Sequence, residues 1–356
     1  MLNGENTLSE NIADNGGLRV SYRALEAYMW THDEPQRLPH ELCGFWRSEA
    51  LKSQMESNPY SPANYWVNVP LYYLQSVHLR FKSVKDKLVL ITGGGSGLGR
   101  ALAIRFAKQG ANVIVWDINK SGLNETVELV RAANPEVIVG SYECDITERH
   151  LVYETAAKVK RDVSAIDILV NNAGVVNGKN LMDIPDEKII QTFQVNAISH
   201  FWTVKAVLPD MMAANSGHLV SIASAAGTTG LCQLTDYCAS KFAAVGFEES
   251  LRYELINANK LGVKSTVVLP YVINTGMFAG FKSPILSALE PDYVADQIMA
   301  GVLTDAEYVA VPRIFYIINT LKTILPVKAF YKAYEVLGGY HWMEDFVGRE
   351  RTNHNN

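Results

Sequence analysis

The stretch Leu88-Val89-Leu90-Ile91-Thr92-Gly93-Gly94-Gly95-Ser96-Gly97-Leu98-Gly99 is the most informative part of this 356-residue chain for its fold. Its first four residues form a continuous apolar run, which is typical of a strand buried on both faces of a sheet. The glycines that follow let the backbone turn sharply, and they lead into a helix whose amino-terminal N–H groups attract phosphate. A glycine-rich turn alone is weak evidence, because many loops carry glycines. The segment as a whole predicts a strand, a phosphate-binding turn and a helix.

Similar apolar runs recur along the chain and are separated by helical stretches. They lie at residues 113–116, 137–139, 168–170, 219–222 and 266–269. Such strands form a parallel sheet covered on both faces, and right-handed crossovers make it a doubly wound α/β sheet, the Rossmann fold. Its ligand binds at the carboxyl ends of the strands. We expect one catalytic domain over residues 87–311.

A second informative stretch is Tyr237-Cys238-Ala239-Ser240-Lys241. Residues four apart on a helix share one face, so the ammonium of Lys241 can favour the phenolate of Tyr237 and lower its pKa. The pKa of a free tyrosine is ~10. For the phenol to act as a base at neutral pH, this pKa must fall by roughly three units, which corresponds to about 4 kcal/mol. Ser224 follows the run 219–222, where its hydroxyl can donate a hydrogen bond to a substrate oxygen.

Each of these pieces has a simpler interpretation when it is taken alone. A tyrosine–lysine pair is more often a solvated helix face, and a serine after a strand is more often an ordinary strand-end hydroxyl. The order of glycine turn, serine, tyrosine and lysine is much less common by chance. Together they indicate a nicotinamide-dependent alcohol/carbonyl oxidoreductase.

Composition limits the other functions. The length suits one large α/β domain with extensions, and a formal net charge of −5 gives no reason to expect nucleic-acid binding. The cysteines have neither CxxC nor metal spacing, which favours a reducing compartment, and no histidines form an HExxH pair. We therefore expect no metal. Cys238 should face away from Tyr237 and serve packing.

The two ends of the chain differ from the domain between them. Residues 1–63 are polar and net acidic, lack a signal-peptide pattern, and are predicted to form a flexible extension with a short helix near residues 22–30. Residues 64–86 are amphipathic: 66–81 is rich in apolar residues, and Arg80, Lys82 and Lys85 lie at its end. We interpret this second segment as a possible membrane contact.

Residues 312–356 are predicted to hold amphipathic helices and a tail. Their apolar residues recur at helical spacing: Ile314, Ile317, Ile318, Leu321 and Leu325, then Val327, Phe330, Tyr331, Tyr334 and Leu337. Each stretch is too short to span a bilayer, which needs about 20 apolar residues. The helices pack either on the domain's own core or a dimer partner, or they lie in a membrane interface. In the second case Arg313, Lys322, Lys328 and Lys332 are available for lipid headgroups.

These motifs resemble those of the short-chain dehydrogenases/reductases, over residues 87–311. The family's TGxxxGxG is present as Thr92, Gly93, Gly97 and Gly99, its NNAG as residues 171–174, its helical asparagine as Asn196, its serine as Ser224 and its YxxxK as Tyr237 and Lys241. Residues 115–119, 270–278, 324–326 and 343–349 are further similar to the branch of type-10 and epidermal retinol dehydrogenases and 17-beta-hydroxysteroid dehydrogenase type 11. The polar start of the chain departs from that branch.

The resemblance implies a cofactor site. It comprises Gly93, Ser96, Gly97, Leu98 and Gly99 around the pyrophosphate, Asp117, Asp145 and Asn172 on the adenosine side, Thr275 at the nicotinamide amide, and Tyr237 and Lys241. Asp117 ends the second strand, where its carboxylate would accept hydrogen bonds from ribose hydroxyls and repel a 2′-phosphate. Neither Ser96 nor Ile118 compensates that charge. We therefore expect NAD rather than NADP.

The resemblance also implies a catalytic tetrad. Tyr237 would exchange a proton with the alcohol, Lys241 would lower its pKa and hold the nicotinamide ribose, and Ser224 would orient the substrate oxygen. Asn196 would position a water that relays protons to the lysine; the alternative is that it only bonds backbone within its helix.

Substrate, partners and location are further expectations. Residues 275–289 are apolar enough for a lid, with Met277 and Phe278 contacting a lipophilic, retinol-like alcohol. A hydroxysteroid, or a non-catalytic NAD-binding lipid-surface protein, is the alternative. We expect a homodimer formed through the helices of Asn196 and Tyr237. We expect it on the cytosolic face of the endoplasmic reticulum or lipid droplets, the alternative being the cytoplasm.

Overall fold

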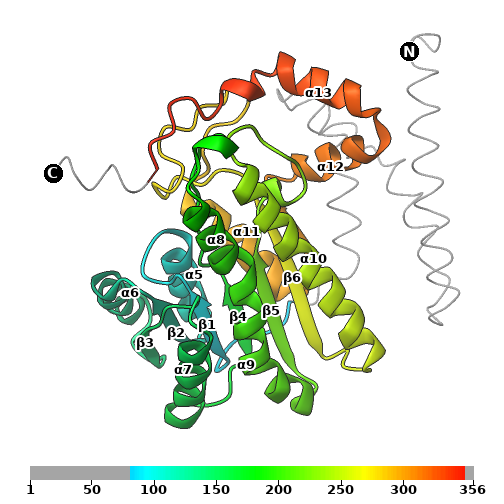
Figure 1. The fold of residues 1–356 in the computed structure, drawn as a ribbon. Coiled ribbons are helices and arrows are strands. Elements are labelled where there is room, and N and C mark those ends of the chain that lie inside the picture. The colour runs from blue at the N-terminus through cyan, green and yellow to red at the C-terminus, as the bar shows by residue number, and fades with distance from the viewer. Residues whose placement is uncertain (1–80, 349–356) are drawn as a thin grey trace, which may run out of the picture. The chain divides into compact units, whose positions relative to one another are not determined.

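Seven parallel strands form one sheet in the order β3-β2-β1-β4-β5-β6-β7 (Figure 1). The structure is a computed structural model that describes residues 81–348. The doubly wound α/β sheet expected from the sequence is confirmed. The prediction for residues 1–63, the part of the 64–86 prediction that covers residues 64–80, and the predicted tail from residue 349 lie outside the described residues.

The strands follow the predicted apolar runs, with two differences at the sheet edges. They are β1 Leu88–Thr92, β2 Asn112–Asp117, β3 Val139–Glu143, β4 Ile168–Asn171, β5 Gly217–Ile222, β6 Val263–Pro270 and β7 Tyr308–Val311. The strand expected at 137–139 is present but lies further along the chain, because β3 begins at Val139 and continues through polar residues to Glu143. As an edge strand, β3 is only partly buried and shows no continuous apolar run. The other edge strand, β7, has no counterpart among the predicted strands.

Helices cover both faces of the sheet. On one face lie α5 Gly97–Lys108, α6 Lys120–Ala133 and α11 Pro291–Leu303, and on the other α7 Arg149–Asp162, α9 Ser199–Ala214 and α10 Thr235–Asn257. A further helix, α8 Asp186–Phe193, runs through a π-helical turn, Gln194–Ile198, into α9. All five residues of β1 are buried. Val89 and Ile91 belong to the hydrophobic core under α5, α6 and α11, and Leu88 and Leu90 belong to the core under α7, α9 and α10. This two-sided burial is why β1 reads as a continuous apolar run.

The strand order reverses direction at β1, which lies between β2 and β4. The turn from β1 to α5 opens at that point, where doubly wound sheets bind their ligands. Gly93 has a φ of +64°, and a Cβ there would lie 2.8 Å from Ala173 Cα. A Cβ at Gly99 would lie 2.3 Å from the Gly93 carbonyl oxygen. The turn therefore requires glycine at both positions.

The chain ends in a helical hairpin that extends past the sheet. It consists of α12 Ile314–Ile324 and α13 Val327–Val336, followed by a short 3-10 helix at Gly339–His341. In Figure 1 the hairpin (orange to red) lies near the end of the molecule at which α10 begins. Among residues 81–348, no helix is long and apolar enough to cross a membrane.

Candidate active site

One cavity of about 710 Å³ lies at the carboxyl ends of the strands. Most of the predicted site residues line it: Gly93, Ser96, Leu98, Asp117, Asp145, Asn172, Ser224, Tyr237, Lys241, Thr275, Met277 and Phe278. The cavity is not lined by three of them, Gly97, Gly99 and Asn196. The two glycines lie at the start of α5, directly after the glycine-rich turn. A volume of this size is typical of a small-molecule or cofactor site.

At one end of the cavity, carboxylates are held by backbone amides. Asp117 accepts hydrogen bonds from Gly95 N and from Asn119 N, each 2.9 Å long. Asp145 accepts from Thr147 N and from Thr147 Oγ1, at 2.9 and 2.7 Å. Both carboxylates keep lone pairs for other donors. With the glycine turn beside them, these residues fit a dinucleotide, and Asp117 would be able to accept hydrogen bonds from its ribose hydroxyls.

Asn172 has a bracing role in this end of the cavity. Its Nδ2 donates to Thr92 O at 2.9 Å and to Gly93 O at 3.1 Å. Asn172 follows β4, so these two bonds fix the glycine turn of β1 against the next strand. Its predicted contact with the adenosine stays a prediction.

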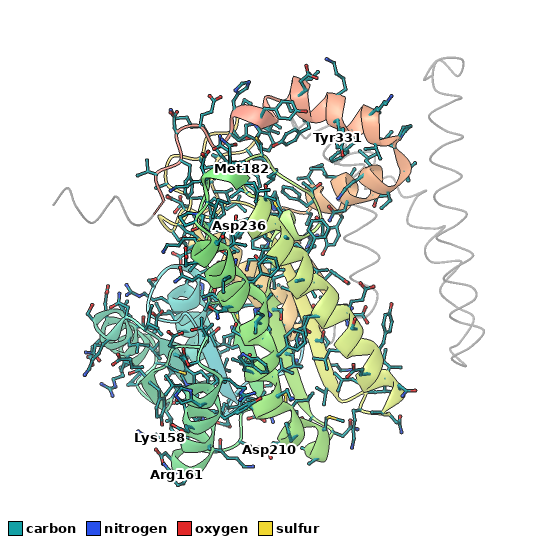
Figure 2. All side chains as sticks on the ribbon, viewed as in Figure 1. Lys158, Arg161, Met182, Asp210, Asp236 and Tyr331 are labelled. Atoms are coloured by element: carbon teal, nitrogen blue, oxygen red, sulfur yellow. The ribbon has the colours of Figure 1, made fainter. Side chains whose placement is uncertain are left out.

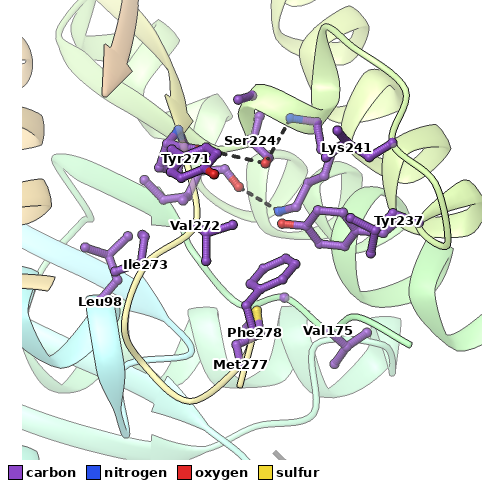
Figure 3. Close-up of a pocket in the computed structure, with 18 of the residues that line it drawn as sticks. Leu98, Val175, Ser224, Tyr237, Lys241, Tyr271, Val272, Ile273, Met277 and Phe278 are labelled. Atoms are coloured by element: carbon purple, nitrogen blue, oxygen red, sulfur yellow. Dashed lines mark hydrogen bonds between the residues drawn. The ribbon is translucent and has the colours of Figure 1, made fainter. Parts of the chain in front are cut away.

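The tyrosine, lysine and serine face one another in the middle of the cavity (Figure 3). Tyr237 and Lys241 lie in the first two turns of α10 and are only 5 % and 3 % exposed. The Lys241 ammonium donates to Ile222 O at 2.8 Å and lies 5.7 Å from the centre of the Tyr237 ring. Ser224 Oγ accepts from Ala226 N at 3.1 Å, and its bond to Pro270 O is long, at 3.4 Å.

Burial sets the electrostatics of this group. Desolvation raises the pKa of Tyr237, and a hydrogen bond with Ser224 partly opposes that rise. Desolvation lowers the pKa of Lys241 from 10.5 to about 8. The lysine is therefore still mainly an ammonium at pH 7. The predicted lowering of the Tyr237 pKa was wrong, because the desolvation of the buried phenol raises it.

Asn196 lies in the π-helical turn and is fully buried. Its Nδ2 donates to Val175 O at 2.9 Å and to Ser240 Oγ at 3.0 Å, and its Oδ1 accepts from Val175 N at 2.8 Å. Both donors of the side chain are thus used within the protein, but not within its own helix as the alternative had it, because Val175 lies after β4 and Ser240 lies in α10. A water relay through Asn196 stays a prediction.

The segment predicted to be a lid is a loop whose ends are tied together. Asn274 N donates to Leu289 O, and Leu289 N donates to Val272 O, each at 2.8 Å. Phe278 lies edge-on to the Tyr237 ring, with 5.6 Å between ring centres. Cys238 is buried in the same cluster, as its packing role requires.

The far end of the cavity was not expected from the sequence as part of the site. It is lined by Ile318 and Leu321 of α12, by Leu325 just after that helix, by Phe330, Tyr334 and Leu337 in and after α13, and by Trp342. Their helical spacing identified an apolar face, but spacing does not say what that face contacts. Part of this apolar face therefore packs on the domain, which was the first of the two alternatives for these helices.

Comparisons with known proteins agree with this geometry. A family model described as short chain dehydrogenase matches residues 87–284. The chain belongs to this family. It is 43 % identical over 303 residues to retinol dehydrogenase 10 of Xenopus tropicalis, covering 77 % of this chain and 89 % of the relative. It is 45 % identical over 273 residues to epidermal retinol dehydrogenase 2 of Mus musculus, covering 76 % and 88 %.

Solved structures show the same fold. A short-chain dehydrogenase/reductase from Burkholderia phymatum in complex with NAD has a TM-score of 0.63 at 24 % identity, covering 68 % of this chain and 95 % of its own. A metagenomic short-chain oxidoreductase in complex with NADP has a TM-score of 0.55 at 26 % identity, covering 64 % and 98 %. The protein is thus a retinol dehydrogenase-like oxidoreductase of a family that uses NAD(P).

The buried lysine gives a stability prediction. Its pKa is about 8 in the folded protein and 10.5 when unperturbed, so burial of the ammonium destabilises the fold below pH 8, and this effect fades between pH 8 and 10.5. Lys241→Met removes a cost of roughly 3 kcal/mol and a hydrogen bond worth about 1 kcal/mol. We expect a net gain of roughly 2 kcal/mol in unfolding free energy at pH 7, which shrinks towards pH 10.

Urea denaturation at both pH values measures this gain. Lys205→Met, at an exposed position of α9, is the control and should show no such trend. A Lys241→Met protein that is less stable than wild type at both pH values would contradict the prediction.

Proposed function

We propose that this oxidoreductase uses NAD to interconvert a lipophilic, retinol-like alcohol and its aldehyde or ketone. The observation that carries the proposal is one continuous cavity, which runs from the Asp117 carboxylate past Tyr237 to the apolar side chains of α12 and α13. A dinucleotide at the polar end leaves the apolar end for the substrate. Similarity to proteins named retinol dehydrogenases supports the same substrate class.

Each catalytic side chain has a role that its contacts permit. Bound NAD would accept a hydride from the alcohol carbon. Tyr237, as the phenolate, would accept the proton of the alcohol. In the reverse direction its hydroxyl would donate a proton to the carbonyl oxygen. Ser224 can redirect its proton from the long bond with Pro270 O to the substrate oxygen. The Lys241 ammonium lies beside the tyrosine ring, where its charge stabilises a phenolate.

Tyr237→Phe tests this assignment. The phenyl ring keeps the packing against Phe278, so the fold and NAD binding should persist while proton transfer is lost. We expect kcat to fall by about 100-fold or more, measured by NADH formation with a lipid-alcohol substrate. Tyr253→Phe, at an exposed position on the same helix, should keep full activity. Comparable turnover by the Tyr237→Phe protein would disprove the role of Tyr237.

NAD rather than NADP is the second part of the proposal. The Asp117 carboxylate would face a 2′-phosphate with its negative charge. The neighbouring guanidinium of Arg100 is already engaged, donating to Gly95 O at 2.6 Å and to Glu125 Oε2 at 2.7 Å. It therefore does not offset that repulsion.

Kinetics with both cofactors test the preference. We expect wild type to favour NAD over NADP in kcat/KM by about tenfold or more, since like charges in contact cost over 1 kcal/mol. Asp117→Asn keeps an acceptor but removes the charge, so the preference should fall about tenfold. A wild-type enzyme that prefers NADP would refute the argument.

We propose attachment to the cytosolic face of the endoplasmic reticulum or of lipid droplets. The turn between α12 and α13 presents Ile324, 71 % exposed, next to Val327, and the end of α13 presents Val336, 75 % exposed. The same hairpin lines the cavity, so a lipid could pass from an interface to the site. Two of the four expected headgroup cations have partners within the protein: the Lys322 ammonium donates to Thr228 O, and the Lys332 ammonium pairs with Glu335 at 3.1 Å.

Fractionation and vesicle binding test this attachment. We expect membrane association that survives high salt and yields to detergent. The double change Ile324→Asp and Val327→Asp removes apolar burial worth a few kcal/mol, so vesicle binding should weaken roughly tenfold or more. Wild-type protein found only in the soluble fraction would exclude the anchor.

We also propose a homodimer that pairs through α9 and α10. Phe201 of α9 is exposed and packs at a tilt against Phe247 of α10, with 4.5 Å between ring centres. Phe242 and Ile256 are further exposed apolar residues on α10. We expect light scattering in mild detergent to give the mass of a dimer. Monomer alone at micromolar concentration would count against this pairing.

A further inference from the structure

The side chain of Tyr334, in α13, lines the part of the cavity next to the C-terminal hairpin. Figure 2 draws the side chains of the hairpin and labels Tyr331 on α13. Tyr334 is half-buried and lines the cavity, whereas Tyr331, one turn earlier on the same helix, is 61 % exposed and does not. The two tyrosines therefore face different surroundings on a single helix.

The hydroxyl of Tyr334 is satisfied by the protein on both sides. It donates to Gly339 O at 2.7 Å and accepts from Cys232 N at 3.1 Å. The ring lies edge-on to Tyr340 and Trp342, with 5.1 and 5.6 Å between centres. A Cβ at Gly339 would lie 2.3 Å from the ring, so the chain is glycine where the ring passes. The cavity therefore meets the carbon surface of a fixed ring.

These contacts fix the wall of the cavity formed by Tyr334 and Trp342 relative to Tyr237. Cys232 lies in the loop that leads into α10, five positions before Tyr237. On the other side, Trp342 O accepts from Lys282 N at 3.0 Å, which joins the wall to the loop over the substrate. Val347 N donates to Ala279 O at 2.8 Å and extends that junction. Tyr334 and Trp342 thus cannot move away without breaking bonds to the loop that leads into α10 and to the loop predicted to be a lid.

We propose that Tyr334 is a specificity-determining residue that sets the upper length of the alcohol. The inference rests on the proposed lipid-alcohol dehydrogenase activity. Each methylene that enters the apolar chamber adds about 0.8 kcal/mol of binding, or roughly fourfold in kcat/KM. A chain that reaches the ring gains nothing further, and a longer one holds its carbinol away from Tyr237. Removing the ring extends the chamber towards the α13 end.

A homologous series of straight-chain primary alcohols, assayed with NAD, tests the proposal. For wild type, kcat/KM should rise with length and then drop sharply. Tyr334→Ala should move the drop to chains longer by several carbons and leave the shorter alcohols within about threefold of wild type. Tyr331→Ala is the matched control and should keep the wild-type profile. Tyr334→Phe keeps the ring and should keep the limit.

The outcomes separate this inference from the proposed function. Activity in wild type with the same length limit in Tyr334→Ala overturns the role of Tyr334 and leaves the proposed function standing. If wild type turns over no lipid alcohol, the proposed function fails. The length limits of wild type and Tyr334→Ala can then be compared without turnover, by the shift in melting temperature that each alcohol causes in the presence of NAD. If Tyr334→Ala does not fold, Tyr334→Leu keeps apolar packing and should shift the limit by fewer carbons; an unshifted limit overturns the proposal.

Discussion

The contact between the turn after β1 and the first turn of α5 is the constraint on which the rest of the site depends. At Gly99 the helix lies so close to the Gly93 carbonyl oxygen that no side chain fits between them. Asn172 fastens the same turn to β4 through two hydrogen bonds. Three elements are thus locked at the point where the strand order reverses. The carboxylate of Asp117, which accepts from Gly95 N, is fixed by the same turn.

The catalytic group carries a cost that only function explains. Burial makes the Lys241 ammonium and the Tyr237 phenolate less stable than they are in water, and the ammonium donates its hydrogen bond to Ile222 O. A structure selected for stability alone would place apolar residues at these positions. The same desolvation strengthens any charge interaction between Lys241 and Tyr237, because a low dielectric leaves it poorly screened.

The fold and most of the site could be predicted from the sequence because their signals are local. Buried parallel strands such as β1 are apolar throughout, and the glycine turn and the Tyr237–Lys241 pair have fixed spacing on single elements. The remainder depends on contacts between distant segments. The edge strand β3 is partly solvated and so loses its apolar signature. The bonds of Asn196 to Val175 and Ser240 join segments that the sequence leaves unrelated.

The C-terminal hairpin shows the same limit more clearly. Helical spacing marks an apolar stripe on α12 and α13, yet it does not separate residues that line a cavity, such as Tyr334, from residues that face outward, such as Tyr331. Nor does sequence reveal that Lys322 is engaged by Thr228. Only the path of the chain over the cavity distinguishes the residues that line it from those that face outward.

The most direct test of the central claim, that one cavity holds both cofactor and lipid alcohol, is a crystal structure of the Tyr237→Phe protein with NAD and a long-chain alcohol. We expect the alcohol oxygen within hydrogen-bonding distance of Ser224 Oγ and the chain along α12 and α13, ending at the Tyr334 ring. An alcohol that binds away from Ser224, or whose chain leaves the cavity without contacting α13, would contradict the claim.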